Sequence, residues 1–199
     1  MKKYSRFITA LSLYVGLTLL IHFAHARLLT VDVVLYSALS DAVMSALLLS
    51  VLLWGWRYFD TFTAFEKMQM LCICLLGGYV FAISVPTVID RSLSMYILEK
   101  LDQRGGSIRQ SAFEDVFTKE YVREHRLVDV RLTEQVVSGT IRIENGCVSL
   151  TPRGQRIAEI TRFYRTHLLP KQRLLMGQYS DDLTDPFRHS VKGTDYGCH

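Results

Sequence analysis

The residue with the sharpest chemical implication is Asp41, which lies inside a long apolar run. If a membrane helix covers residues 33–55, this carboxylate lies within about one turn of the helix centre, since each residue rises ~1.5 Å. A carboxylate at that depth is costly and normally faces protein or water. Pairing with another group is the favoured interpretation, because a proton relay needs more than one such residue. A polar cavity, a protonated acid, or a later helix start that brings Asp41 near the interface are the alternatives.

The four cysteines and six histidines form no metal-ligand pattern. Cys72 and Cys74 lie in an apolar run, where cysteine acts as a small hydrophobe, and a lone C-x-C pair is not a zinc signature. Cys147 and Cys198 lie in the polar half and would pair only in an oxidising compartment. His22 is interpreted as a polar tip near a membrane boundary. No metal is therefore expected.

The sequence also carries no catalytic signature. It contains no glycine-rich phosphate loop, G-x-S-x-G, H-E-x-x-H or paired-carboxylate motif. Glu124 and His125 are interpreted as a solvated helix end, because a catalytic base needs a positioned partner and a pocket. We expect no enzymatic activity and no cofactor. A membrane enzyme acting on a lipid-linked substrate is a third-ranked option, based on Asp41 and Arg91 near the bilayer.

The elements that position these residues begin with three apolar segments. Hydrophobic residues make up 49% of the 199-residue chain and concentrate before residue 90. The runs 7–24, 31–56 and 68–89 are each long enough for about one bilayer crossing. They predict a three-helix transmembrane domain over residues 1–89, embedded in a lipid bilayer. A cleaved signal peptide ending at Ala24-His25-Ala26 is the alternative for the first run.

The second segment carries small residues at every fourth position: Ala38, Ala42, Ala46 and Ser50. Small residues at that spacing line one stripe of a helix and let another helix approach closely. Together with Asp41, the stripe predicts packing against a partner helix in this chain or another. A membrane protein partner or a homo-oligomer is the expected consequence. Chance in an alanine-rich helix is the alternative.

Charge indicates orientation and limits the class of partner. The formal net charge is +4, and from residue 90 onward 17 basic and 15 acidic residues leave +2. This balance is not the footprint of a dedicated nucleic-acid binder. Asp90 and Arg91 mark the exit from the membrane. Lys2, Lys3 and Arg6 favour an N-terminus inside, and three spans then place the soluble part outside the cytoplasm, across a bacterial inner membrane.

The soluble part reads as three helices, a hairpin and a fourth helix. Helical spacing covers residues 93–101, 111–122 and 128–137. Asn145-Gly146 is the strongest short hairpin signal, and it sets Ile143 opposite Val148 and Ile141 opposite Leu150. The four apolar residues share one face of the hairpin, and that face is expected to pack against another element. A proline at position 152 then opens a long amphipathic helix, and residues 171–199 are expected to be an irregular tail.

Residues 148–158, Val-Ser-Leu-Thr-Pro-Arg-Gly-Gln-Arg-Ile-Ala, resemble the SLTPKGRxxA segment that closes the wing in MarR-type regulators. The resemblance implies a mainly α architecture ending in a winged-helix-like α+β domain, over residues 92–168 of a soluble region 90–170. In such regulators the helix before the wing enters the major groove.

The surface that would read DNA is poorly equipped here. The helix before the wing pairs its one arginine, Arg131, with the acids Asp129 and Glu134, and the wing offers Arg142 beside Glu144. Phosphate contacts dominate affinity for DNA, so nucleic acid is not an expected partner and these side chains are candidates for protein binding.

These observations predict a non-enzymatic integral membrane accessory or interaction subunit. A cell-envelope complex that assembles or exports a surface glycan is the proposed setting. The alternative is a membrane-tethered winged-helix transcription regulator, for which the soluble part would lie in the cytoplasm.

Overall fold

The computed structural model describes residues 2–188 and residue 198, which are mainly helical. The chain divides into two compact units, residues 1–125 and 126–199. The division falls after His125, inside the segment for which the sequence predicts a single winged-helix domain.

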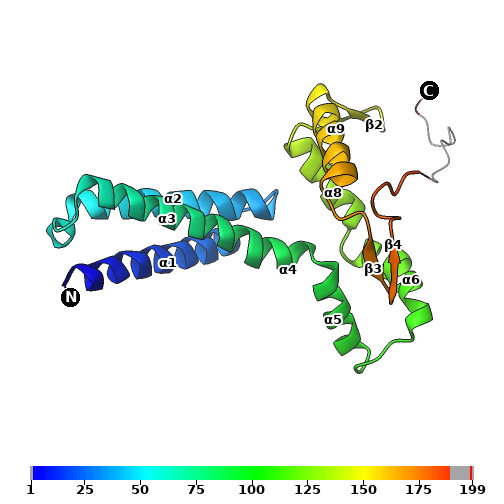
Figure 1. Ribbon diagram of the computed structural model, residues 1–199, viewed down its shortest axis with the longest axis horizontal. Helices are drawn as coiled ribbons and strands as arrows, with labels where there is room; N and C mark the ends of the chain where they lie inside the picture. The colour runs from blue at the N-terminus through cyan, green and yellow to red at the C-terminus, as the bar shows by residue number, and fades with distance from the viewer. Residues whose placement is uncertain (1, 189–197, 199) are drawn as a thin grey trace. The chain divides into compact units, whose positions relative to one another are not determined.

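The first unit begins with three long helices that lie side by side (Figure 1): α1 (Lys2–Leu28), α2 (Val34–Gly55) and α3 (Ala64–Ala82). A short helical turn, η1 (Arg57–Phe59), joins the second to the third. The third helix continues through a π-helical stretch, η2 (Ile83–Thr87), into α4 (Val88–Arg91). Within the described residues, three helices are long and apolar enough to cross a membrane. The three predicted apolar segments are thus present as helices, which supports a membrane-spanning protein.

Local chemistry explains where the third helix begins and where it deforms. Thr63 and Glu66 form a capping box, in which the hydroxyl accepts from Glu66 N and the carboxylate accepts from Thr63 N. Pro86 lies inside η2, where it cannot donate a backbone hydrogen bond. Thr87 Oγ1 donates to the Ala82 carbonyl at 2.7 Å and satisfies one of the backbone groups affected by the π-helical turn.

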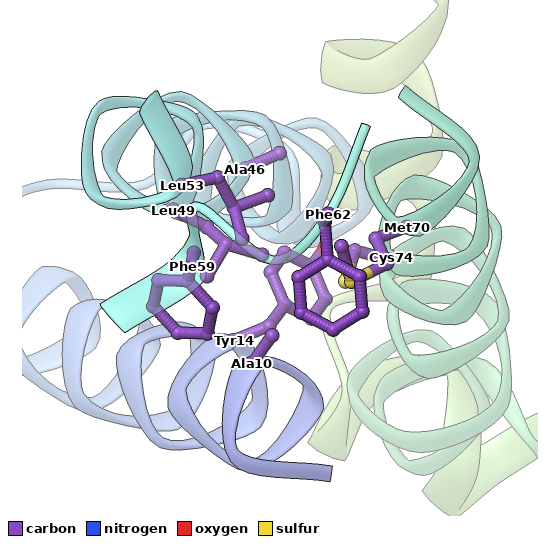
Figure 2. Close-up of a cluster of buried hydrophobic side chains, with 9 residues drawn as sticks. All are labelled: Ala10, Tyr14, Ala46, Leu49, Leu53, Phe59, Phe62, Met70 and Cys74. Carbon is purple, nitrogen blue, oxygen red and sulfur yellow. The ribbon is translucent and has the colours of Figure 1, made fainter. Parts of the chain in front are cut away.

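The core of the three-helix bundle lies at the end where α2 turns back into α3. Figure 2 shows its buried side chains, which come from all three helices and the connecting turn: Ala10, Tyr14, Ala46, Leu49, Leu53, Phe59, Phe62, Met70 and Cys74. Other large apolar side chains of the bundle, such as Leu47, Val51 and Leu76, are exposed. That distribution suits helices whose outer surface faces hydrocarbon, since lipid is as apolar as leucine.

The rest of the first unit is a chain of shorter helical pieces: α5 (Leu93–Gln103), η3 (Gln110–Ala112), α6 (Phe113–Asp115), the π-helical η4 (Val116–Tyr121) and α7 (Val122–Glu124). Ser92 caps α5 by accepting from Met95 N at 3.3 Å. The helix predicted at 111–122 is therefore present as consecutive pieces, with a π-helical middle.

The second unit begins with α8 (Leu127–Val137), followed by the antiparallel strands β1 (Ile141–Glu144) and β2 (Cys147–Leu150) and then α9 (Pro152–His167). The register pairs Ile143 with Val148 and Ile141 with Leu150, as the turn predicts. Asn145 and Gly146 have φ of 52° and 77°, the left-handed values that a type I′ turn requires.

The winged-helix domain is not confirmed, although the helices and the hairpin follow in its order. The helices before residue 126 belong to the first unit and α8, the hairpin and α9 to the second. The apolar face of the hairpin is also largely uncovered, because Ile143, Val148 and Leu150 are exposed.

The tail differs from its prediction. Strands β3 (Arg173–Leu175) and β4 (Gln178–Ser180) form a second short antiparallel hairpin in residues expected to be irregular. Its turn places Met176 at φ 48° and Gly177 at φ 89°. The signal is weak in sequence because methionine rarely adopts a positive φ. Residues 189–197 and 199 of the predicted tail lie outside the described residues.

Candidate functional site

A carboxylate held by two histidines lies between the first two membrane helices. Asp41 of α2 has no exposed surface, and one imidazole of α1 contacts each of its oxygens. His22 Nδ1 lies 2.8 Å from Oδ2, and His25 Nδ1 lies 2.6 Å from Oδ1. These are distances of charge-assisted hydrogen bonds. Asp41 is thus paired within its own chain, and the three residues are named here the Asp41 cluster.

Helix geometry brings the three side chains of the cluster together. His22 and His25 are three residues apart on α1, so they share a face of that helix. The five-residue loop 29–33 turns the chain back, so that the end of α1 meets the beginning of α2. On α2, Ser37 Oγ lies 3.2 Å from His25 Nδ1, and Ser45 Oγ donates to the Asp41 backbone carbonyl at 2.7 Å.

The hydrogen-bond pattern assigns roles to the ring nitrogens. An ionised carboxylate only accepts hydrogen bonds, so with Asp41 ionised each Nδ1 donates its proton to it. Each neutral imidazole then carries its hydrogen on Nδ1 and keeps Nε2 as a proton acceptor. The chemistry available to this arrangement is uptake and release of protons. Among the described residues, no group of three or more His, Cys, Asp and Glu side chains is arranged to hold a metal ion.

Close packing of the three helices fixes the cluster. The ring of Phe81 on α3 meets His22 edge-on, with 5.6 Å between ring centroids. Tyr14 Oη donates to the Ala42 carbonyl at 3.2 Å. A Cβ at Gly78 would lie 2.2 Å from Tyr14 Oη and 2.6 Å from Ala42 Cβ, so only glycine permits this approach of α3.

The small-residue stripe of α2 lies inside the three-helix bundle. Ala38, Ala42 and Ala46 are 0%, 3% and 6% exposed, and Ser50 is half-buried. The close helix approach that the spacing indicates is made to α1 and α3 of the same chain. The buried part of the stripe is therefore occupied without a second protein.

The residues singled out in the second unit form short-range ion pairs. Arg131 Nη1 lies 2.8 Å from Glu134 Oε2 on α8. On the hairpin, Arg142 Nε donates to Ser149 Oγ at 3.0 Å and lies 3.7 Å from Glu144 Oε1. A glutamate meets the charge of each arginine, which reduces the attraction of this surface for phosphate.

The juxtamembrane pair is also a local contact. At the end of α4, Arg91 Nε lies 3.9 Å from Asp90 Oδ2. This is the weak, partly exposed type of ion pair, and it does not share a cluster with Asp41 in the described contacts.

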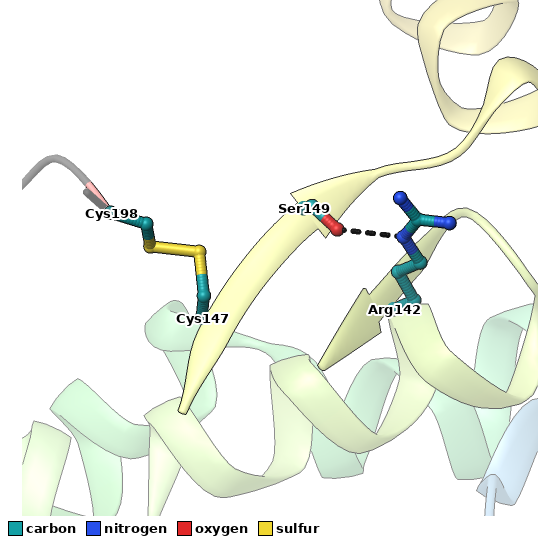
Figure 3. Close-up of a disulfide and its surroundings, with 4 residues drawn as sticks. All are labelled: Arg142, Cys147, Ser149 and Cys198. Carbon is teal, nitrogen blue, oxygen red and sulfur yellow. Dashed lines mark hydrogen bonds between the residues drawn. A yellow bond between two sulfur atoms is a disulfide. The ribbon is translucent and has the colours of Figure 1, made fainter. Parts of the chain in front are cut away.

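A disulfide joins the first hairpin to the C-terminal segment. Cys147 and Cys198, 51 residues apart, are bonded, with 6.0 Å between their Cα atoms (Figure 3). A structural disulfide of this kind forms and persists in an oxidising compartment. The other two cysteines, Cys72 and Cys74, are free thiols in α3.

A second charged cluster, named here the Lys100 cluster, lies in the soluble part of the first unit. Lys100 is 5% exposed and lies 2.8 Å from Glu120 Oε2 and 2.6 Å from Glu124 Oε1. Tyr96 donates to Glu124 at 2.8 Å, and Arg104 donates to both oxygens of Glu120. Hydrogen bonds to the two glutamates raise the pKa of Lys100. The lysine in turn lowers the pKa of Glu120 and of Glu124, with Arg104 and Tyr96 as the next donors.

Comparison with known proteins adds no assignment. No protein-family model, curated protein or solved structure matches this chain. The likeness of residues 148–158 to MarR-type regulators therefore depends on the motif alone.

Sequence reasoning found the acid of the Asp41 cluster and missed its two bases. His22 was predicted to be an interfacial polar tip, and His25 was considered only as part of a cleavage site. A usable signal was present: two histidines three residues apart near the end of one apolar run, with an aspartate early in the next. Antiparallel helices joined by a short loop bring such positions to similar depth.

Proposed function

We propose that the chain is a non-enzymatic, membrane-anchored interaction subunit that binds a partner protein through its C-terminal unit. The observation that carries the proposal is the apolar surface of that unit. Its exposed members come from the hairpin face, from one stripe of α9 and from the residue that follows this helix: Ile143, Val148, Leu150, Ile157, Ile160, Tyr164 and Leu168. Large exposed apolar patches on a soluble unit mark interaction sites.

A groove beside this surface supports the kind of partner. It has a volume of about 690 Å³ and is lined by Ile141 and Leu150 of the hairpin and by Ile157 of α9. Arg162, Arg165 and Arg188 also line it, and Asp185 is the one acid among the described residues of the lining. A partner segment that carries apolar side chains and carboxylates fits this groove. Its apolar side chains would pack on the apolar lining and supply affinity. Its carboxylates would meet the arginines and supply specificity.

The setting we propose is a cell-envelope complex of a bacterial inner membrane, with the C-terminal unit outside the cytoplasm. The three apolar helices supply the anchor. The bond between Cys147 and Cys198 supports an oxidising location, and the basic N-terminus favours the same orientation. No described contact points to a glycan, so the proposal does not include one.

Site-specific photocrosslinking in native membranes tests the proposal. A photoreactive residue at Ile160, on the apolar stripe, should give an adduct with one discrete protein. The same residue at Glu159, which lies about 100° around α9 from Ile160 and outside the apolar stripe, should not. The Arg162→Glu substitution should weaken the adduct at position 160, because it reverses the charge that meets the acidic part of the partner. Equal labelling from positions 159 and 160, or none from either, would contradict the proposal.

A membrane-tethered winged-helix regulator is the second candidate, and one contact favours it. Gly154 packs so closely on Thr140 that a Cβ would lie 2.0 Å from the Thr140 carbonyl oxygen, while Thr151 caps α9 by accepting from Gly154 N. This is a tight junction of wing and helix at the segment that resembles MarR-type proteins. A reporter fused after His199 separates the candidates: an external C-terminus excludes the regulator, and a cytoplasmic one excludes the envelope orientation.

A further inference from the structure

We infer that Asp41, His22 and His25 form a proton-binding site inside the membrane. The inference rests on charge. With an ionised acid and two neutral imidazoles the cluster carries −1, and one added proton makes it neutral. A net charge among apolar helices costs several kcal/mol by desolvation, so a low-dielectric surrounding favours the form that holds one proton. Two imidazoles around one carboxylate give that proton two alternative places, one on each histidine.

Apart from the two histidines, the described side chains in contact with the cluster are uncharged, so the histidines are its proton acceptors. From α1, His22 and His25 face the carboxylate. From α3, the contact is the uncharged ring of Phe81. On α2 the nearby side chains are the hydroxyls of Ser37 and Ser45. In these contacts no lysine or arginine compensates the charge of Asp41 and no second acid adds to it, so the charge balance depends on the imidazoles.

The position of the cluster gives the proton a route. His25 lies three residues before the end of α1, about 4.5 Å of helix rise from the boundary of the span. The side chains of His22 and His25 are 25% and 20% exposed, whereas Asp41 is fully buried. Of the three side chains, only the imidazoles reach the surface of the bundle, so a proton that arrives from the nearby boundary meets an imidazole before the carboxylate. The end of α1 and the end of the third span at Arg91 lie on the same side of the three-helix bundle, so the site responds to the aqueous phase on the side where the soluble part emerges.

The consequence is a pH-dependent attachment of α1 to α2. Both hydrogen bonds to Asp41 join these two helices. Imidazole is the side-chain group whose protonation ordinarily responds to pH near neutrality, so the two histidines are the groups through which pH would act on this attachment. The proton moves from water to a ring nitrogen and back, and no other reactant is needed.

Histidine titration in the full-length protein tests the inference. We would label histidine with ¹⁵N, dissolve the protein in detergent micelles and record ring-nitrogen shifts from about pH 5 to 8. His22→Gln and His25→Gln assign the two signals. In the unsubstituted protein the two imidazoles should titrate in coupled steps. In His22→Gln, His25 should titrate in one step, with its midpoint displaced by about half a pH unit or more.

Two further variants separate a proton site from a merely structural contact. Asp41→Asn should abolish the coupling between the histidines, and Asp41→Glu, which keeps the carboxylate, should retain it if the asparagine variant does not fold. His167→Gln, at an exposed position on α9, should leave both titrations unchanged. The inference is overturned if the curve of His25 is the same with and without His22, or if neither imidazole changes protonation across this range.

Discussion

The two charged clusters of the first unit are opposites in composition. In the membrane helices, one buried acid, Asp41, is held by two histidines. In the soluble helices, one buried base, Lys100, is held by two glutamates. Both place a single charge at the centre with two partners around it, and both join segments distant in sequence. They differ in what the partners do when pH changes.

That difference shows how the surroundings select the residue types. Glu120 and Glu124 are 31% and 44% exposed, so water helps to solvate a permanent charge there. The partners of Asp41 lie beside apolar helices, where a permanent excess charge is costly. Histidine can become neutral, whereas lysine and glutamate stay charged near neutral pH. The first cluster is therefore suited to responding to protons and the second to holding helices together.

Removing both histidines should give the largest effect. The double substitution His22→Leu with His25→Leu leaves the buried carboxylate unpaired, and the loss in free energy of unfolding should be about 3–5 kcal/mol. Denaturant titration of the full chain in micelles, followed by circular dichroism, measures it. The control is His167→Leu, at an exposed position, which should change the free energy of unfolding little. An equal loss in the control and in the double variant would mean that Asp41 does not depend on its two histidine partners.

Removing the acid should cost less. Asp41→Asn leaves two imidazoles that can deprotonate, so the loss should be about 1–3 kcal/mol, the cost of impaired buried hydrogen bonds. The same denaturant titration, carried out at several pH values, should also show that the pH dependence between about pH 5 and 8 is reduced. A larger loss than for the double histidine variant would reverse the proposed roles of acid and bases.

A change outside the cluster tests whether helix packing supports it. Gly78→Ala places a Cβ against Tyr14 Oη and Ala42, and such overpacking should cost about 1–3 kcal/mol. The adjacent variant Gly77→Ala is the matched control, because a Cβ there meets nothing within 4 Å. It should be neutral or stabilising by up to about 1 kcal/mol. Equal destabilisation of both variants would exclude close helix approach as the cause.

The Lys100 cluster should give the smallest effect on the pH dependence of stability near neutral pH. The lowered pKa of Glu120 and Glu124 means that their stabilisation is complete above the ordinary value of about 4.3 and is lost as pH falls through the lowered values. The raised pKa of Lys100 means that its stabilisation is complete below about 10.4 and is lost as pH rises through the raised value. Lys100→Met should therefore leave the pH profile of thermal unfolding unchanged between about pH 5 and 8, where the Asp41 variants alter it.

Features that depend on residues close together in the sequence were predictable, and features that depend on contacts between distant segments were not. The three spans, the register set by Asn145-Gly146 and the start of the last helix at Pro152 were all predicted, because each depends on residues close together in the chain. The hairpin at Met176-Gly177 was missed because its turn residue is atypical. The packing of residues 92–168 into one winged domain was expected and is not confirmed, because element order does not determine which helices share a core.

The sequence by itself determined that three apolar helices precede a polar half and that one of them carries a costly carboxylate. Hydrophobic length and local turn chemistry are enough for that, since they act within one segment. Only the tertiary structure decided that His22 and His25 meet Asp41 and that the alanine stripe is filled from within the chain. It also decided that Cys147 bonds to Cys198. These contacts join different segments and require a specific antiparallel register or chain path, which composition and spacing along one segment do not specify.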